Sequence, residues 1–209
     1  MKFGKLLAGL TLAAAATSAQ SAVLDSNDGL LTYTGPSFVD VATNNDFLDD
    51  EIAAGSQYGI GGILELNGMA DLTFTYLGFE AGYDNDFEAY NNTFSNRGGN
   101  ASTVGDSFSA TADELVFSFY ANNVNSGVEN PNNPVVGNQH QSFAVMLDSM
   151  WDGVMYDAIL LFDDSGAGPD DNHDDLVVGL NAVAVSEPAT LALMGLGLLG
   201  LGAARRRQA

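Results

Sequence analysis

Alternation of apolar and polar residues with a period of two is the feature that most limits the folds open to this chain. Side chains on a β-strand point alternately to its two faces, so such a run predicts a half-buried strand. The five clearest runs are Leu72 to Tyr76, Leu115 to Phe119, Phe143 to Leu147, Tyr156 to Phe162 and Leu176 to Ala182. Shorter candidates are Leu30 to Thr34, Tyr58 to Leu66 and Thr103 to Phe108.

Strands of this kind need a second layer to cover their apolar faces. The segments between them are rich in Asn, Asp and Gly, which favour turns. The sequence therefore predicts an all-β domain over residues 23–185, an antiparallel β-sandwich or jelly roll. Residues 122–138, rich in Asn, Pro and Gly, are predicted to form a mobile surface loop. There is no cysteine, so no disulfide supports the core.

The first 22 residues are typical of a secretory signal peptide. Lys2 and Lys5 precede an apolar stretch from Leu6 to Ala16, and small residues follow it. Cleavage after Ala19 or Ala22 would suit this pattern. The sequence thus predicts export through the secretion translocon.

Residues 186–209 have three parts, a short polar start, an apolar run and a basic end. The apolar run, Leu191 to Ala204, contains 14 residues. As a helix it would be about 21 Å long, which makes it a marginal transmembrane helix. It has no polar face, which argues against a helix lying along the membrane surface. A weak tail anchor is the alternative. Arg205, Arg206 and Arg207 would hold its end on the cytoplasmic side.

This tail resembles the sorting signal of the bacterial PEP-CTERM proteins, which carry a Pro-Glu-Pro signature, an apolar helix and a basic cluster. The resemblance implies processing by an exosortase, a membrane protease, near Ser186, Glu187 and Pro188. Ser186 replaces the usual first proline, which leaves the cut position open. The resemblance also implies transient anchoring in the inner membrane, then a place at the cell surface or outside the cell, in an extracellular matrix or biofilm associated with exopolysaccharide.

The predicted domain is strongly acidic once both ends are set aside. Of the 27 acidic residues only Glu187 lies outside residues 23–185, and Arg97 is the one Lys or Arg within them. The resulting net charge is about −25 if all are ionised. Such a surface repels phosphate, so nucleic-acid binding is excluded.

The stretch from Asp163 to Val178 concentrates this acidity between two predicted strands, the second of which should begin near Asp175. Ca²⁺ accepts many oxygen ligands in flexible geometry. The sequence therefore makes Ca²⁺ the candidate cofactor, with Asp163, Asp170, Asn172, Asp174 and Asp175 as ligands. The pattern is not an EF-hand, because its glycine and glutamate positions hold Asp175 and Asn181. A solvated loop without metal is the alternative.

Two segments, Ala81 to Phe87 and Asp163 to Val178, also resemble stretches that recur in secreted PEP-CTERM proteins. That resemblance implies one sandwich domain and no established reaction. An enzyme is not expected, because the only histidines are His140 and His173 and no nucleophile-elbow motif accompanies them. The competing hypothesis is a calcium-dependent carbohydrate-binding module, with Asp170, Asn172 and Asp174 at its site. Trp151 could add a sugar platform there, although a single tryptophan in a sandwich more often belongs to the core.

Overall fold

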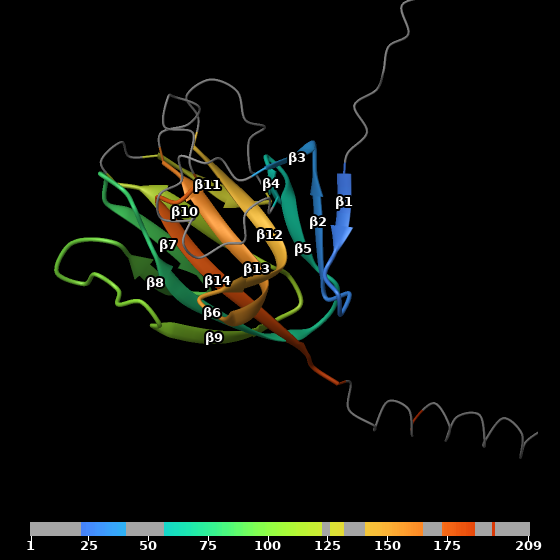
Figure 1. The fold of residues 1–209 in the computed structure, drawn as a ribbon. Helices are drawn as coiled ribbons and strands as arrows, with labels where there is room; N and C mark the ends of the chain where they lie inside the picture. Colours follow the sequence, from blue (N-terminus) through green and yellow to red (C-terminus); the bar gives the residue numbers. More distant parts are fainter. Residues whose placement is uncertain are drawn as a thin grey trace, which may run out of the picture.

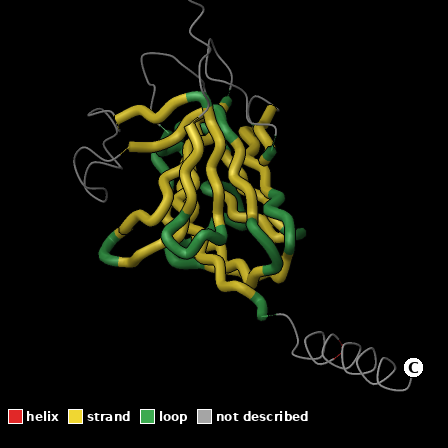
Figure 2. Tube along the Cα trace, turned by 90° about the vertical axis from the view of Figure 1, so that its right-hand side faces the viewer, coloured by secondary structure: helices red, strands yellow, loops and turns green. Residues whose placement is uncertain are grey.

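The computed structural model describes residues 22–40, 57–122, 126–131, 141–164, 173–186 and 194. Fourteen strands lie within these ranges, and all their pairings are antiparallel (Figure 1). Long strands lie side by side with loops at both ends (Figure 2). Residues 1–21 of the predicted signal peptide and nearly all of the predicted sorting helix lie outside the described residues.

The largest sheet has seven strands in the order β3-β4-β12-β13-β14-β6-β9. Its strands are β3 (Ser37–Asp40), β4 (Gln57–Ile60), β12 (Ser142–Trp151), β13 (Val154–Asp163), β14 (Leu176–Ala184), β6 (Ala70–Gly78) and β9 (Ser107–Ala112). Strands β12 and β13 form a hairpin whose turn, Asp152-Gly153, has positive φ at both residues. This turn geometry matches the twist of paired strands.

Two smaller sheets complete the fold. One has the order β11-β10-β7-β8, with β11 (Ser126–Asn130), β10 (Phe117–Ala121), β7 (Asn85–Ala89) and β8 (Asn92–Ser95). The other has the order β1-β2-β5, with β1 (Ala22–Asp25), β2 (Leu31–Gly35) and β5 (Ile63–Leu66).

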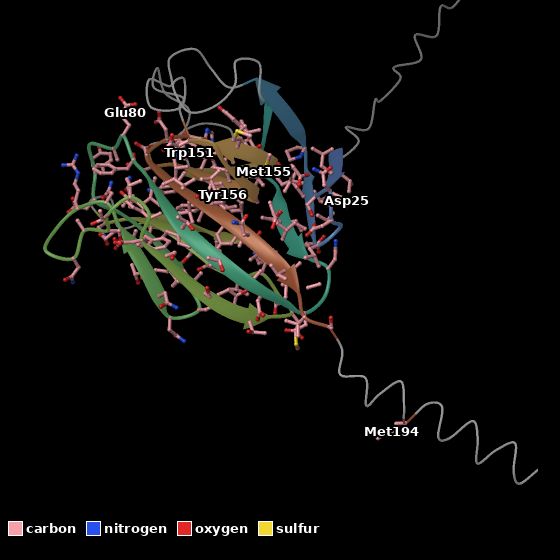
Figure 3. The ribbon with its side chains drawn as sticks, turned by 60° about the horizontal axis from the view of Figure 1, so that its bottom comes forward. Asp25, Glu80, Trp151, Met155, Tyr156 and Met194 are labelled. Carbon is pink, nitrogen blue, oxygen red and sulfur yellow. The ribbon has the colours of Figure 1, made fainter. Side chains whose placement is uncertain are left out.

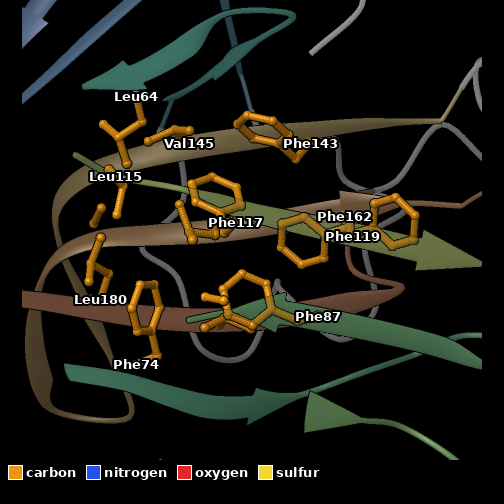
Figure 4. Packing of buried hydrophobic residues seen from close by; sticks show 14 of the residues in the cluster. Leu64, Phe74, Phe87, Leu115, Phe117, Phe119, Phe143, Val145, Phe162 and Leu180 are labelled. Atoms are coloured by element: carbon orange, nitrogen blue, oxygen red, sulfur yellow. The ribbon is translucent and has the colours of Figure 1, made fainter. Parts of the chain in front are cut away.

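Aromatic side chains from the four-stranded and seven-stranded sheets form the main core between them (Figure 4). Phe119 of β10 stacks on Phe162 of β13, with ring centroids 5.0 Å apart and an interplanar angle of 7°. The ring of Phe87 on β7 packs against the ring of Phe74 on β6, with the two centroids 5.5 Å apart. These contacts join the two layers, so the predicted antiparallel β-sandwich is confirmed.

The central strands of the seven-stranded sheet are buried on both faces. On β13 every residue from Ala158 to Asp163 is buried, whereas alternation predicted burial of every second residue. Ile159 and Leu161 belong to a second apolar cluster on the face away from the main core. Trp151 and Tyr156 belong to the same cluster (Figure 3). Trp151 is only 5% exposed, so it is a core residue and not a sugar platform.

The long alternating runs predicted the strands more accurately than the short runs did. The run Tyr58 to Leu66 divides at Gly61, whose φ is +67°, and its halves, β4 and β5, join different sheets. The segment predicted as a mobile loop over residues 122–138 contains a strand, β11, at the edge of the four-stranded sheet. The short run Thr103 to Phe108 was placed too early in the chain, because the strand there, β9, begins only at Ser107.

Candidate functional site

A group of buried aspartates lies where the chain leaves β13 and returns on β14. Phe162 and Leu176 are register partners, so the residues that follow one and precede the other lie close together. Four of them, Asp163, Asp164, Asp174 and Asp175, are buried and are called here the acidic cluster. Both described ends of the acidic stretch are therefore buried and not solvated.

The acidic cluster is tied to the opposite sheet by Asn85, the first residue of β7. The Asn85 side-chain amide donates to Asp164 Oδ2 at 2.6 Å and more weakly to the Asp175 carbonyl at 3.4 Å. The Asp164 N–H donates to Asp175 Oδ2 at 2.7 Å. The two segments singled out by resemblance, around Asn85 and around Asp164, thus meet in space.

Asn85 is held rigidly by its other contacts. Its backbone N–H donates to Asn96 Oδ1 at 2.8 Å, and the Asn96 N–H donates back to the Asn85 carbonyl at 3.0 Å. The Asn85 side chain is fully buried, and its Oδ1 has no hydrogen-bond partner among the described residues. A buried amide oxygen without a donor is unusual in a folded protein.

Burial dominates the electrostatics of this region. It raises the pKa of Asp175 to about 8, and the neighbouring Asp164, Asp163 and Asp174 add to that rise. Burial also lowers the pKa of His173 to about 4, so this imidazole is neutral near pH 7. Arg97, the one Lys or Arg in the described ranges, pairs instead with Asp84, at 4.0 Å and near the surface.

Ser142 and His173 form a contact that resembles a nucleophile and its base. The Ser142 hydroxyl and His173 Nε2 are 2.9 Å apart, but the residues are 1% and 0% exposed. A substrate has no access to a hydroxyl buried this deeply, and nucleophilic catalysis needs such access. The Tyr58 ring covers the imidazole at a centroid distance of 5.3 Å. The contact is therefore part of the packing.

The structure places the predicted calcium ligands only in part. Asp163, Asp174 and Asp175 are brought together, while Asp170 and Asn172 lie outside the described residues. Within the described ranges no three Asp, Glu or His side chains converge as a metal site would require. Asp164 and Asn85 were missed as members of this region, because their meeting depends on the packing of two sheets.

A hollow of about 560 Å³ lies on the outer side of the four-stranded sheet. A row of cross-strand partners lines the hollow: Thr93, Glu88, Ser118 and Glu129. Along their strands these four residues alternate with residues that point into the core. The hairpin turn Tyr90-Asn91 also lines it, with φ values of +49° and +63°. The hollow combines carboxylates, amides and hydroxyls at the surface.

Comparison with known protein families matches residues 184–207 to the PEP-CTERM protein-sorting motif. The chain carries a PEP-CTERM sorting motif. The matched range includes Ser186, Glu187 and Pro188 together with the arginines at 205–207. A PEP-CTERM motif marks an exported protein whose C-terminal region anchors it in a membrane and is recognised by an exosortase. The predicted PEP-CTERM sorting signal is therefore confirmed.

No curated protein and no solved structure matches the chain significantly. Among the residues that the structure describes, no helix is long and apolar enough to cross a bilayer. The PEP-CTERM motif is thus the functional information that comparison supplies.

Proposed function

We propose that this PEP-CTERM protein is a non-enzymatic component of the cell surface or extracellular matrix, associated with exopolysaccharide or biofilm. The sorting motif at residues 184–207 carries the proposal, because such a motif marks an exported protein that an exosortase recognises. The acidic body suits this location, since like-charged surfaces keep a secreted protein soluble. The burial of Ser142 and His173 supports a role without nucleophilic catalysis.

Processing of the tail is the first test. We expect mass spectrometry of the surface or secreted protein from its native cell to show a chain that has lost Arg205, Arg206 and Arg207. The arginines serve the membrane step, so a chain that leaves the membrane must be cut before them.

A strain without its exosortase provides the control. There the chain should remain in the membrane fraction with its three arginines intact, while the N-terminal signal peptide is still removed. A released protein that keeps Arg205 to Arg207 in the normal strain would contradict the processing proposal.

A second candidate function is carbohydrate binding, and the hollow beside Glu88, Ser118 and Glu129 is the observation that favours it. Carboxylates and amides accept and donate hydrogen bonds to sugar hydroxyls. Of the calcium-dependent site that the sequence predicts, Trp151 and Asp174 are buried and offer no surface to a sugar. The outer side of the four-stranded sheet replaces it as the proposed location.

Blocking the hollow tests this function. We expect Ser118→Trp to weaken binding of the exopolysaccharide purified from the producing cells at least tenfold, measured by calorimetry on the full chain. Ser109→Trp, an equal substitution at an exposed position on β9, should leave binding unchanged. Equal binding by the two variants, or none by the unmodified chain, would rule out this site.

A further inference from the structure

Strand β9 is an outer edge of the seven-stranded sheet. It pairs with β6 on one side, and no described strand pairs with its other side (Figure 1). An edge of this kind presents a row of backbone N–H and C=O groups to which a further strand can bond, and proteins commonly protect it with charged side chains, proline or a bulge. From Ser107 to Ala112, β9 contains no charged residue and no proline, and its register with β6 is unbroken.

The other five edge strands of the described sheets differ from β9, which is the longest with six residues. Strand β8 has four residues, and its Ser95 carbonyl accepts from the Ser102 N–H at 2.7 Å. In a domain with a net charge of about −25, an uncharged edge is where a second molecule of equal charge meets least repulsion. The remaining edges, β1, β3, β5 and β11, each contain an acidic residue, which is Asp25, Asp40, Glu65 and Glu129 in turn.

The ladder with β6 fixes which backbone groups of β9 face outward. Just before the strand begins, the Tyr76 N–H donates to the Asp106 carbonyl at 2.9 Å. These two residues are therefore a hydrogen-bonded pair, and such pairs alternate along an antiparallel ladder. By the register of the two strands, every second residue of β9 from Phe108 bonds to β6. The residues whose N–H and C=O groups point away from β6 are Ser107, Ser109 and Thr111.

We infer that β9 pairs antiparallel with β9 of a second copy of this chain, so that two seven-stranded sheets join into one. A two-fold axis beside Ser109 gives every outward residue a partner within the strand. Ser109 then faces its own equivalent, and Ser107 faces Thr111 of the second copy. Hydroxyl side chains that face each other across two strands favour the pairing.

Charge selects this register over its neighbours. With the axis beside Ser109, Asp106 faces Ala112 of the second copy, and no carboxylate lies opposite another. A shift by two residues in one direction would place Asp106 opposite Glu114, where like charges repel. A shift in the other direction would leave Thr111 opposite Gly105, outside the strand. This inference does not depend on the matrix role or on the hollow, so it can fail separately from both.

Sedimentation of the full chain in detergent, over a range of protein concentrations, tests the pairing. We expect a monomer–dimer equilibrium that strengthens when salt rises from about 0.01 M to about 0.1 M, because the shorter Debye length screens the repulsion between two acidic bodies. Ser109→Pro should weaken dimerisation at least about tenfold, since proline removes an outward N–H and leaves the ladder with β6 intact. A monomer at every concentration would overturn the inference.

Thr93→Pro on β8 is the matched control. The Asn96 N–H donates to the Asn85 carbonyl, so by the same alternation the Thr93 N–H faces away from β7. Proline at this second edge should leave dimerisation unchanged. Equal dimerisation by Ser109→Pro and the unmodified chain, as association through the apolar tail would give, contradicts pairing through β9.

A charge exchange at Ser109 tests the register itself. Ser109→Asp and Ser109→Lys should each be monomeric alone, because two like charges would face each other at the axis. Their equimolar mixture should form the mixed dimer, measured by native mass spectrometry. Ser109 is exposed, so both variants should keep the Tm of the unmodified chain. A mixture that dimerises no better than either variant alone would overturn the proposed register.

Discussion

Replacing Phe119 by alanine is expected to lower the free energy of unfolding by about 3–5 kcal/mol. Phe119 is 1% exposed and lies between the two larger sheets. Its ring stacks on Phe162 and meets Phe87 and Phe143 at centroid distances of 5.0 Å and 6.2 Å. Truncation removes the contacts of both layers at once and leaves a cavity that the flanking strands cannot close. Denaturant unfolding followed by the fluorescence of Trp151, the one tryptophan, measures the change.

Val183→Ala provides the comparison. Val183 lies on β14 but is 65% exposed, so its truncation should change the free energy of unfolding by less than about 0.5 kcal/mol. Similar unfolding curves for the two variants would show that Phe119 does not join the sheets as described.

Asn130→Ala is expected to have a comparable effect, a loss of about 3 kcal/mol or more, for a different reason. The buried Asn130 amide accepts from the Leu64 N–H at 3.0 Å and donates to the carbonyls of Leu64 and Leu115 at 2.7 Å each. It therefore pairs with β5 as a neighbouring strand would. Alanine leaves three buried backbone groups without this partner, and each unsatisfied group costs about 1–3 kcal/mol.

Two further substitutions isolate the amide. Asn130→Asp keeps the acceptor for Leu64 but turns an oxygen toward two carbonyls, so it should destabilise the chain about as much as alanine does. Asn92→Ala removes an exposed amide with one hydrogen bond, to the Tyr90 carbonyl at 3.0 Å, and should cost under about 1 kcal/mol. If the denaturant midpoints show that Asn130→Ala and Asn92→Ala lose similar amounts of stability, the Asn130 amide does not bridge the two sheets as described.

Long periodic runs made most of the sandwich predictable. Leu72, Phe74 and Tyr76 alternate with threonines, and all three apolar side chains lie in the core as expected. Strand β7 was missed, because Asn85, Asp86 and Glu88 resemble turn residues when only their neighbours in the chain are considered. Its apolar residue Phe87 is nevertheless central to the core.

Only the acidic residues of the candidate site could be predicted from the sequence. Asp163, Asp174 and Asp175 stand in one acidic stretch, and the unfavourable crowding of carboxylates marks that stretch in any fold. Asn85 is 79 residues from Asp164 and carries no charge, so no local pattern connects them. Their hydrogen bond exists because β7 and β13 belong to facing sheets.

By itself the sequence determined the sorting motif at residues 184–207, the acidic character of the body and the longest strands. These follow from local chemistry, since a tail is recognised as a linear segment and strand periodicity is set by backbone geometry. Tertiary structure alone decided that Trp151 is buried, that Asn130 bridges two sheets and that Asn85 meets the acidic cluster. Such contacts depend on the order of strands within and between sheets, which many residues distant in the chain determine together.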